Sequence, residues 1–103
     1  MSRTKQRRIR VRELMLRARV HLEDDSRFST HEMMNRIQEL TKEELRGIPF
    51  AASIQRHVDS PVTCALFIKG HPDIENHPDG TENIGKGRGP GRCRSQLWAF
   101  REE

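Results

Sequence analysis

Two helix-start signals close together near the middle of the chain constrain its fold most. STHE at 29–32 and TKEE at 41–44 both have capping-box spacing, in which a cap hydroxyl accepts from the first turn and a glutamate reaches back to the cap amide. Apolar residues at helical spacing follow the first signal and predict a helix over 30–40. The second signal predicts a short helix that Gly47 ends in a left-handed conformation.

Further helices are predicted on both sides of this pair. Val11, Leu14 and Ala18 recur at helical spacing within residues 5–23. The absence of glycine and proline there favours a helix over the strand that a local polar–apolar alternation would also fit. Pro49 marks the start of a third helix. Its core-facing residues are expected to be Phe50, Ala51, Ile54 and Val58.

The last third of the chain reads as two strands around a long loop. The short, partly β-branched run TCALFIK at 63–69 is typical of a buried strand. Residues 71–94 include eight glycines and prolines, so we expect no core element there. Residues 95–101, with Leu97, Trp98 and Phe100, are predicted as a second strand that pairs with the first across the loop.

Positive charge is concentrated at two separate places. Residues 1–19 hold eight bases and one acid, and residues 86–94 hold four bases and no acid. Residues 20–85 between them have six bases and twelve acids, so the net charge of +4 hides a strong segregation. Such a distribution indicates a polyanionic partner more clearly than the total charge does.

The order of elements, with a short strand around Phe28, resembles the winged helix-turn-helix family. The most specific stretch is LTKEELRGIPFAASIQRHV at 40–58, where a capped short helix, a turn with Gly47 and a helix with small residues follow one another. The terminal hairpin resembles the wing. The resemblance implies an α+β domain over residues 9–103, with three to four helices and a two- or three-stranded C-terminal wing. A basic flexible arm, residues 1–8, would precede it, and the wing loop would span 71–94.

This resemblance implies sequence-specific binding of double-stranded DNA, as in a small transcription regulator that needs no cofactor. The third helix would enter the major groove, with Ser53, Gln55 and Arg56 on its outward face. Gln55 can pair with adenine, and Arg56 with guanine or phosphate. The alternative is that these are ordinary solvated residues of an amphipathic helix. A homodimer that pairs two half-sites is compatible with the family.

Basic residues outside the third helix are candidate phosphate contacts. Those in the loop are Lys86, Arg88, Arg92 and Arg94, and those in the arm are Arg7, Arg8 and Arg10. The loop residues lie among glycines that let the backbone approach a surface closely, and family wings reach along phosphates or into the minor groove. The alternatives are a solubilising loop without a partner, and a first helix whose solvated face is basic.

The sequence supports a metal site or an enzyme less well than it supports DNA binding. Cys64, His71, His77 and Cys93 offer ligands that zinc prefers, but six, five and fifteen residues separate them, without the tight pairs of a zinc finger. The two cysteines fit unrelated thiols better than a disulfide. GKGRG lacks phosphate-loop spacing, and no nucleophile has a convincing base beside it, so we expect neither an enzyme nor a metal site.

The sequence also allows an acidic protein or RNA as the partner, and it predicts an intracellular location. An acidic protein partner is the main alternative to DNA, because the fold class alone does not decide the function. RNA ranks third, since the tryptophan and the four phenylalanines are expected in the core and leave no stacking surface. No apolar run is long enough to span a bilayer, which predicts an intracellular protein with no membrane partner.

Overall fold

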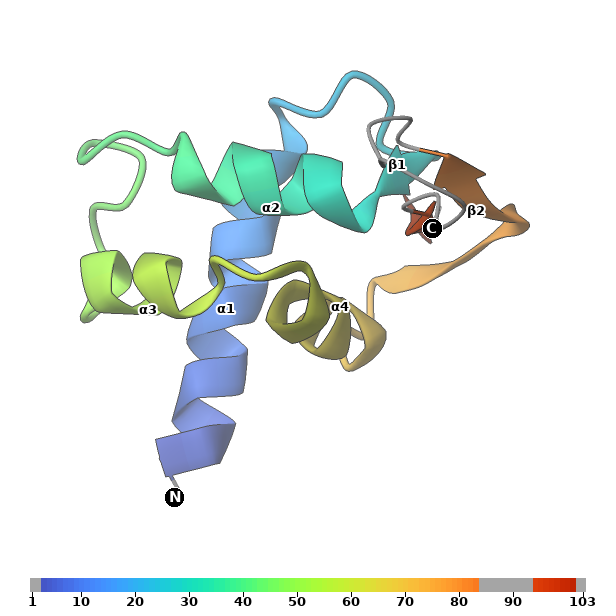
Figure 1. Cartoon of the computed structure of the whole chain (residues 1–103). Helices are drawn as coiled ribbons and strands as arrows, with labels where there is room; N and C mark the ends of the chain where they lie inside the picture. The colour runs from blue at the N-terminus through green and yellow to red at the C-terminus, as the bar shows by residue number, and fades with distance from the viewer. Residues whose placement is uncertain (1–2, 84–93, 102–103) are drawn as a thin grey trace, which may run out of the picture.

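The computed structural model describes residues 3–83 and 94–101, which form four helices and one three-stranded antiparallel sheet in an α+β arrangement. In chain order the elements are α1 (Arg3–Arg19), β1 (Phe28–Ser29), α2 (Thr30–Gln38), α3 (Ala51–His57), α4 (Pro61–Lys69), β2 (Ile74–Asn83) and β3 (Arg94–Phe100). The long helix α1 crosses the molecule, α2, α3 and α4 pack beside it, and the sheet lies at one end (Figure 1).

The sheet is built around its C-terminal strand. The strand order is β1-β3-β2, and Phe28 of β1 lies opposite Trp98 of β3. On the other edge of β3, Ile74 lies opposite Phe100, and the register shifts between Asn76 and Thr81. The predicted strand at 95–101 and the short strand around Phe28 are therefore confirmed.

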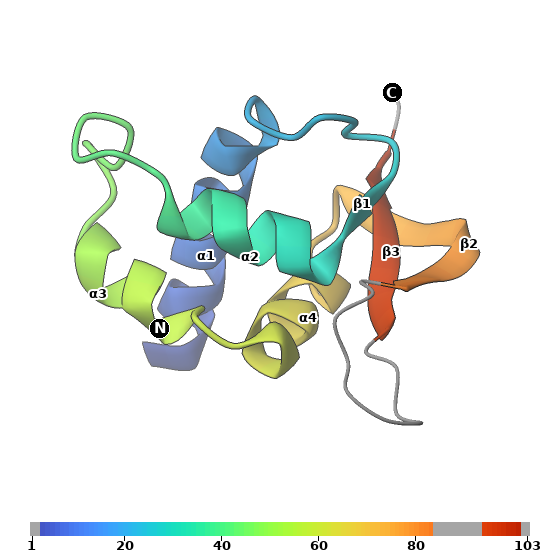
Figure 2. The same ribbon diagram turned by 45° about the horizontal axis from the view of Figure 1, so that its top comes forward.

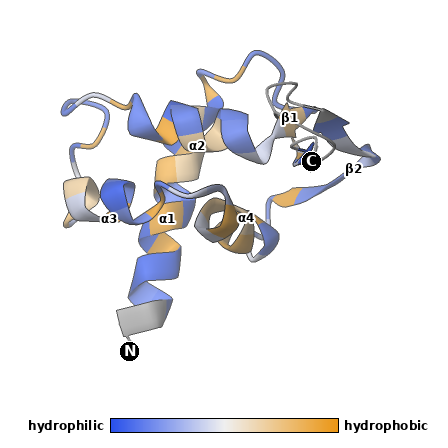
Figure 3. Cartoon of the chain, in the orientation of Figure 1, coloured by the Kyte–Doolittle hydropathy of each residue, from blue (hydrophilic) through white to orange (hydrophobic). Residues whose placement is uncertain are grey.

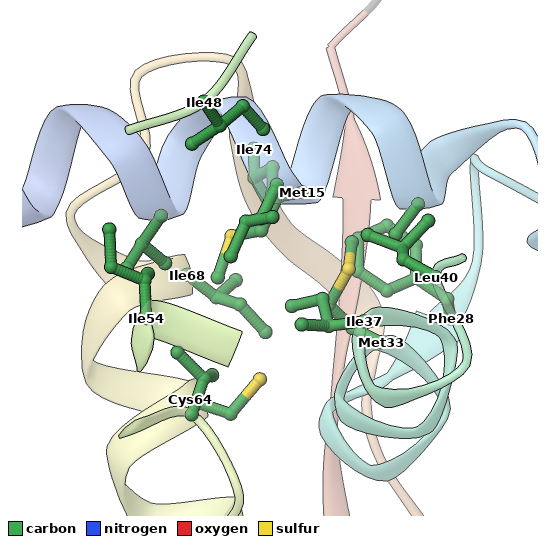
Figure 4. Close-up of a cluster of buried hydrophobic side chains, with 14 of the residues drawn as sticks. Met15, Phe28, Met33, Ile37, Leu40, Ile48, Ile54, Cys64, Ile68 and Ile74 are labelled. Atoms are coloured by element: carbon green, nitrogen blue, oxygen red, sulfur yellow. The ribbon is translucent and has the colours of Figure 1, made fainter. Parts of the chain in front are cut away.

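One hydrophobic core joins the helices to the sheet (Figure 4). α1 contributes its predicted apolar face, whose residues Val11, Leu14, Met15 and Ala18 are fully buried. The predicted helix over 30–40 is confirmed as α2, and its cap forms, because the Glu32 amide donates to Ser29 Oγ at 3.0 Å. The core therefore follows the helical periodicity of the sequence closely.

The predicted strand at 63–69 is wrong, because these residues form α4. Pro61 is in the first turn, where its missing amide costs nothing, and the Cys64 amide donates to the Ser60 carbonyl at 2.9 Å. Cys64 and Ile68, four residues apart, are buried on one side of the helix. Residues 63–69 therefore do not pair with residues 95–101 as expected, and β2 is the strand that pairs with β3 instead.

The predicted loop at 71–94 is also wrong in part, because β2 occupies Ile74–Asn83 and Ile74 is buried. Gly80, with φ of 77°, lies in the irregular stretch between the two paired parts of the strand. A polar edge strand needs only backbone pairing with β3, which explains why its composition resembles a loop.

The second capping signal forms turns rather than a helix. The amide of Glu44 donates to Thr41 Oγ1 at 3.3 Å, and the amide of Thr41 donates back to Glu44 Oε1 at 3.2 Å. Gly47 has the expected positive φ, 89°. Residues 41–50 are therefore an ordered link of turns between α2 and α3.

Two views agree that α4 lies between α3 and the sheet (Figures 1 and 2). The sequence instead predicts a hairpin directly after the third helix. The additional helix places the start of the hairpin on the far side of α4 from α3. This layout determines which of the predicted contact residues can act together.

Candidate nucleic-acid interface

The basic N-terminal segment is helical almost from its start. α1 begins at Arg3, so Arg7 and Arg8 lie in a helix and not in the flexible arm expected for residues 1–8. Residues 5–9 are exposed, whereas the core face of the helix begins at Val11. Residues 5–8 of α1 therefore extend beyond the core, and this part of the helix has hydrophilic residues (Figure 3).

A cleft of about 400 Å³ separates these turns from α3. Its lining consists of Gln6, Arg7, Arg10, Phe50, Ser53 and Ile54. Three predicted contact residues, Arg7, Arg10 and Ser53, thus come together from two helices. No carboxylate is in the lining, so the electrostatic potential inside this cleft is positive.

Phe50 was expected to face the core, but its side chain is 74% exposed. Ile48 and Ala51, on either side of it, are buried and supply the apolar contacts instead. Phe50 has the left-handed φ of 57°, which is uncommon for a bulky residue, and it precedes the first turn of α3. The guanidinium of Arg10 lies 5.3 Å from the centre of its ring, a cation–π distance.

Gln55, which was predicted to lie on the outward face of the third helix as a base contact, makes hydrogen bonds within the fold. Its Nε2 donates to the carbonyl of Ile37 at 2.7 Å and lies 3.3 Å from the carbonyls of Gln38 and Leu40. In return, Gln38 Nε2 donates to the carbonyl of Gln55 at 2.6 Å. The two side chains satisfy the C-terminal carbonyls of α2 and α3 reciprocally, so the Gln55 amide nitrogen is not available to adenine.

The other predicted residues divide between separate surfaces. Ser53 and Arg56 are exposed on α3, and Arg94 is exposed at the start of β3, beyond α4. Arg8 lines a different groove, between α1 and α4. The remaining predicted contacts, Lys86, Arg88 and Arg92, lie outside the described residues.

Arginines in the rest of the described chain are mostly paired with carboxylates. Arg19 lies 2.8 Å from Asp25, and Arg27 lies 3.0 Å from Asp79. By contrast, within residues 3–83 and 94–101 none of the arginines at 7, 8, 10 and 12 forms an ion pair. These four arginines therefore carry positive charge that no carboxylate in the described part of the molecule pairs with.

The proposed zinc ligands do not come together among the described residues, where no group of three histidine, cysteine or acidic side chains could hold a metal. Cys64 is buried with a free thiol that donates to the Thr30 carbonyl, and burial raises the pKa of this thiol to about 12. It stays protonated at neutral pH, unlike a thiolate ligand or nucleophile. Cys93 lies outside the described residues.

Comparison with protein-family models, with curated proteins and with solved structures finds no match to this chain. Within the described residues, no helix is long and apolar enough to cross a membrane.

Proposed function

We propose that the protein binds double-stranded DNA through the surface formed by the N-terminal half of α1 and by α3. This α1–α3 surface consists of Arg7, Arg10, Phe50, Ser53 and Arg56. The observation that carries the proposal is the carboxylate-free cleft, which brings two arginines of α1 to the serine of α3. Crowded cations repel one another, and a phosphate backbone relieves that repulsion while releasing its counterions.

Phosphate contacts would supply most of the affinity, and two residues would supply base discrimination. Arg7 and Arg10 lie one helical turn apart on α1, so both can reach the same phosphate backbone beside α3. With Gln55 engaged in the fold, Ser53 and Arg56 remain to contact base edges. Arg94 and the loop residues would add phosphate contacts only where the DNA extends past α4.

Fluorescence anisotropy with a labelled random-sequence duplex, titrated at several salt concentrations, tests this proposal. Replacing both Arg7 and Arg10 with alanine should weaken binding to all sequences and lower the salt slope by about 2, about one unit per lost phosphate contact. Arg101→Ala, which removes an exposed charge at the end of the sheet, is the matched control and should leave the slope unchanged. An unaltered slope in the double variant would exclude this surface.

Single-stranded nucleic acid is a second candidate, and Phe50 favours it. An exposed aromatic ring beside two arginines is a stacking platform for an unpaired base. The expectation that RNA is a weaker candidate than DNA assumed that every aromatic ring lies in the core, and Phe50 does not. Phe50→Ala should weaken binding of single strands by about tenfold, since one stacked base is worth about 1–3 kcal/mol. If duplex binding is equally impaired, the ring contacts DNA in both forms.

A further inference from the structure

α4 differs from α3 because its exposed face is apolar. The side chains of Val62 and Leu66 are 73% and 67% exposed, while Cys64 and Ile68 on the opposite face are fully buried. Val62 and Leu66 are four residues apart and therefore lie one above the other on the helix. A short helix with apolar residues on both faces is typical of a segment that a further surface covers.

A small groove of about 210 Å³ lies beside this face, between α1 and the C-terminal end of α4. Its lining consists of Arg8, Arg12, Leu66, Phe67, Lys69 and Gly70. Arg12 is held in place, because its Nη2 donates to the Gly70 carbonyl at 3.0 Å. Three cations and two large apolar residues line the groove, with no acid among them.

We propose that this α1–α4 groove binds an acidic peptide segment that carries a large apolar side chain. The volume suits a single leucine or phenylalanine side chain, which would contact Leu66 and Phe67. Carboxylates beside that residue would pair with Arg8 and Lys69 on opposite sides of the groove. A second apolar residue one helical turn away would cover Val62, as in helix-in-groove recognition.

Apolar chemistry distinguishes this groove from the α1–α3 surface. A duplex presents phosphates and polar base edges, and apart from thymine methyl groups it offers little that would bury Leu66 and Val62. Phe67 packs against α3, because its ring and that of His57 form an edge-to-face pair with centroids 6.0 Å apart. The groove is thus preformed, which lowers the entropic cost of binding a peptide.

Fluorescence anisotropy with three synthetic peptides of about four helical turns tests the proposal. One is amphipathic, with leucines on one face and glutamates elsewhere. The second has the same composition in scrambled order, and the third replaces the glutamates with lysines. Only the first should bind at micromolar concentration; binding by none of them, or equal binding of the scrambled peptide, would overturn the proposal.

Variants of the full chain locate the site. Leu66→Ser should weaken the amphipathic peptide about tenfold, while Val20→Ser, at a residue 78% exposed elsewhere, should not. Arg8→Ala should weaken it about threefold, and Arg7→Ala, whose side chain lines the other cleft, should have no effect. Equal effects of Arg7→Ala and Arg8→Ala would reduce the binding to general charge attraction.

Two further measurements test whether DNA or a second copy of the chain, and not a peptide, occupies the groove. Leu66→Ser should leave duplex DNA affinity unchanged; a loss as large as that for the peptide would make the groove part of the nucleic-acid surface and overturn the proposal. Size-exclusion chromatography should give the same elution volume for Leu66→Ser and wild type, because a shift from dimer to monomer would identify a second copy as the occupant. Failure of DNA binding itself leaves the peptide result intact, since the two rely on different side chains.

Discussion

Arginine has two different environments in this molecule. At the sheet end, Arg19 and Arg27 lie against the carboxylates of Asp25 and Asp79, and the Arg19 guanidinium also stacks over the ring of Phe100 at 4.5 Å. At the other end, Arg7, Arg8 and Arg10 of α1 have no ion pair within the described chain. The same residue type therefore supports the fold in one region and leaves it with uncompensated repulsion in the other.

This difference matters because Arg7 and Arg8 form no ion pair within the described chain that would stabilise the fold, although Arg10 has a cation–π contact with Phe50. Arg7 and Arg8 are exposed on turns that extend beyond the core, so shorter or neutral residues would serve the helix equally well. An external anion is the simplest physical reason for a cluster of this kind, and the two grooves that flank α1 give it two surfaces.

Reversing charge at each end gives the largest expected effect. The double variant Arg7→Glu with Arg10→Glu should lower duplex affinity about a hundredfold at moderate salt. Its thermal midpoint should stay the same or rise, because repulsion between neighbouring cations is relieved. Anisotropy and thermal unfolding followed by circular dichroism measure the two quantities on the same samples.

The matched variant is Arg19→Glu with Arg27→Glu, which changes the net charge equally at the sheet end. It breaks the contacts to Asp25 and Asp79, so its thermal midpoint should fall while duplex affinity changes little. Comparable loss of affinity in both doubles would mean that total charge, and not the α1–α3 surface, determines binding.

A smaller effect separates two neighbouring residues of α3. Gln55→Ala removes the donor to the C-terminal carbonyls of α2 and should lower the free energy of unfolding by about 1–2 kcal/mol. Duplex affinity per folded molecule should not change. Arg56→Ala should do the reverse, with nearly unchanged urea unfolding and weaker DNA binding. A loss of affinity in Gln55→Ala with unchanged stability would restore Gln55 as a base contact.

The predictable parts of the fold are those where a local signal and the core agree. α2 has both a cap and apolar periodicity, and β3 has an alternation that the sheet uses directly. α4 was missed because a seven-residue apolar run fits a strand or a buried helix equally well, and only the neighbouring elements decide. β2 was missed because an edge strand with Pro78 and Gly80 pairs through its backbone and has no sequence pattern of its own.

The candidate site was predictable residue by residue but not as an arrangement. Charge segregation identified Arg7 and Arg10, and helical spacing identified Ser53. Their meeting in one cleft depends on how far α1 extends past the core, which no local pattern specifies. The inward turn of Gln55 depends on carbonyls fifteen to eighteen residues away in the chain, so sequence spacing alone could not reveal it.

The smallest expected effect concerns His71, which is buried against the ring of Phe100 in the sheet. Burial lowers the pKa of its imidazole below the usual 6.5, while the Asp73 carboxylate and the backbone of Arg12 oppose this in part. As pH falls through 6.5 the unfolded chain takes up a proton that the folded protein does not, so stability should decrease until the folded pKa is reached. His71→Asn keeps an acceptor for the Asp73 amide, which now donates to Nδ1 at 3.1 Å, and should flatten this slope between about pH 6.5 and 5 in urea unfolding. Identical slopes in the two proteins would show that His71 takes up its proton as easily in the folded state as in the unfolded chain.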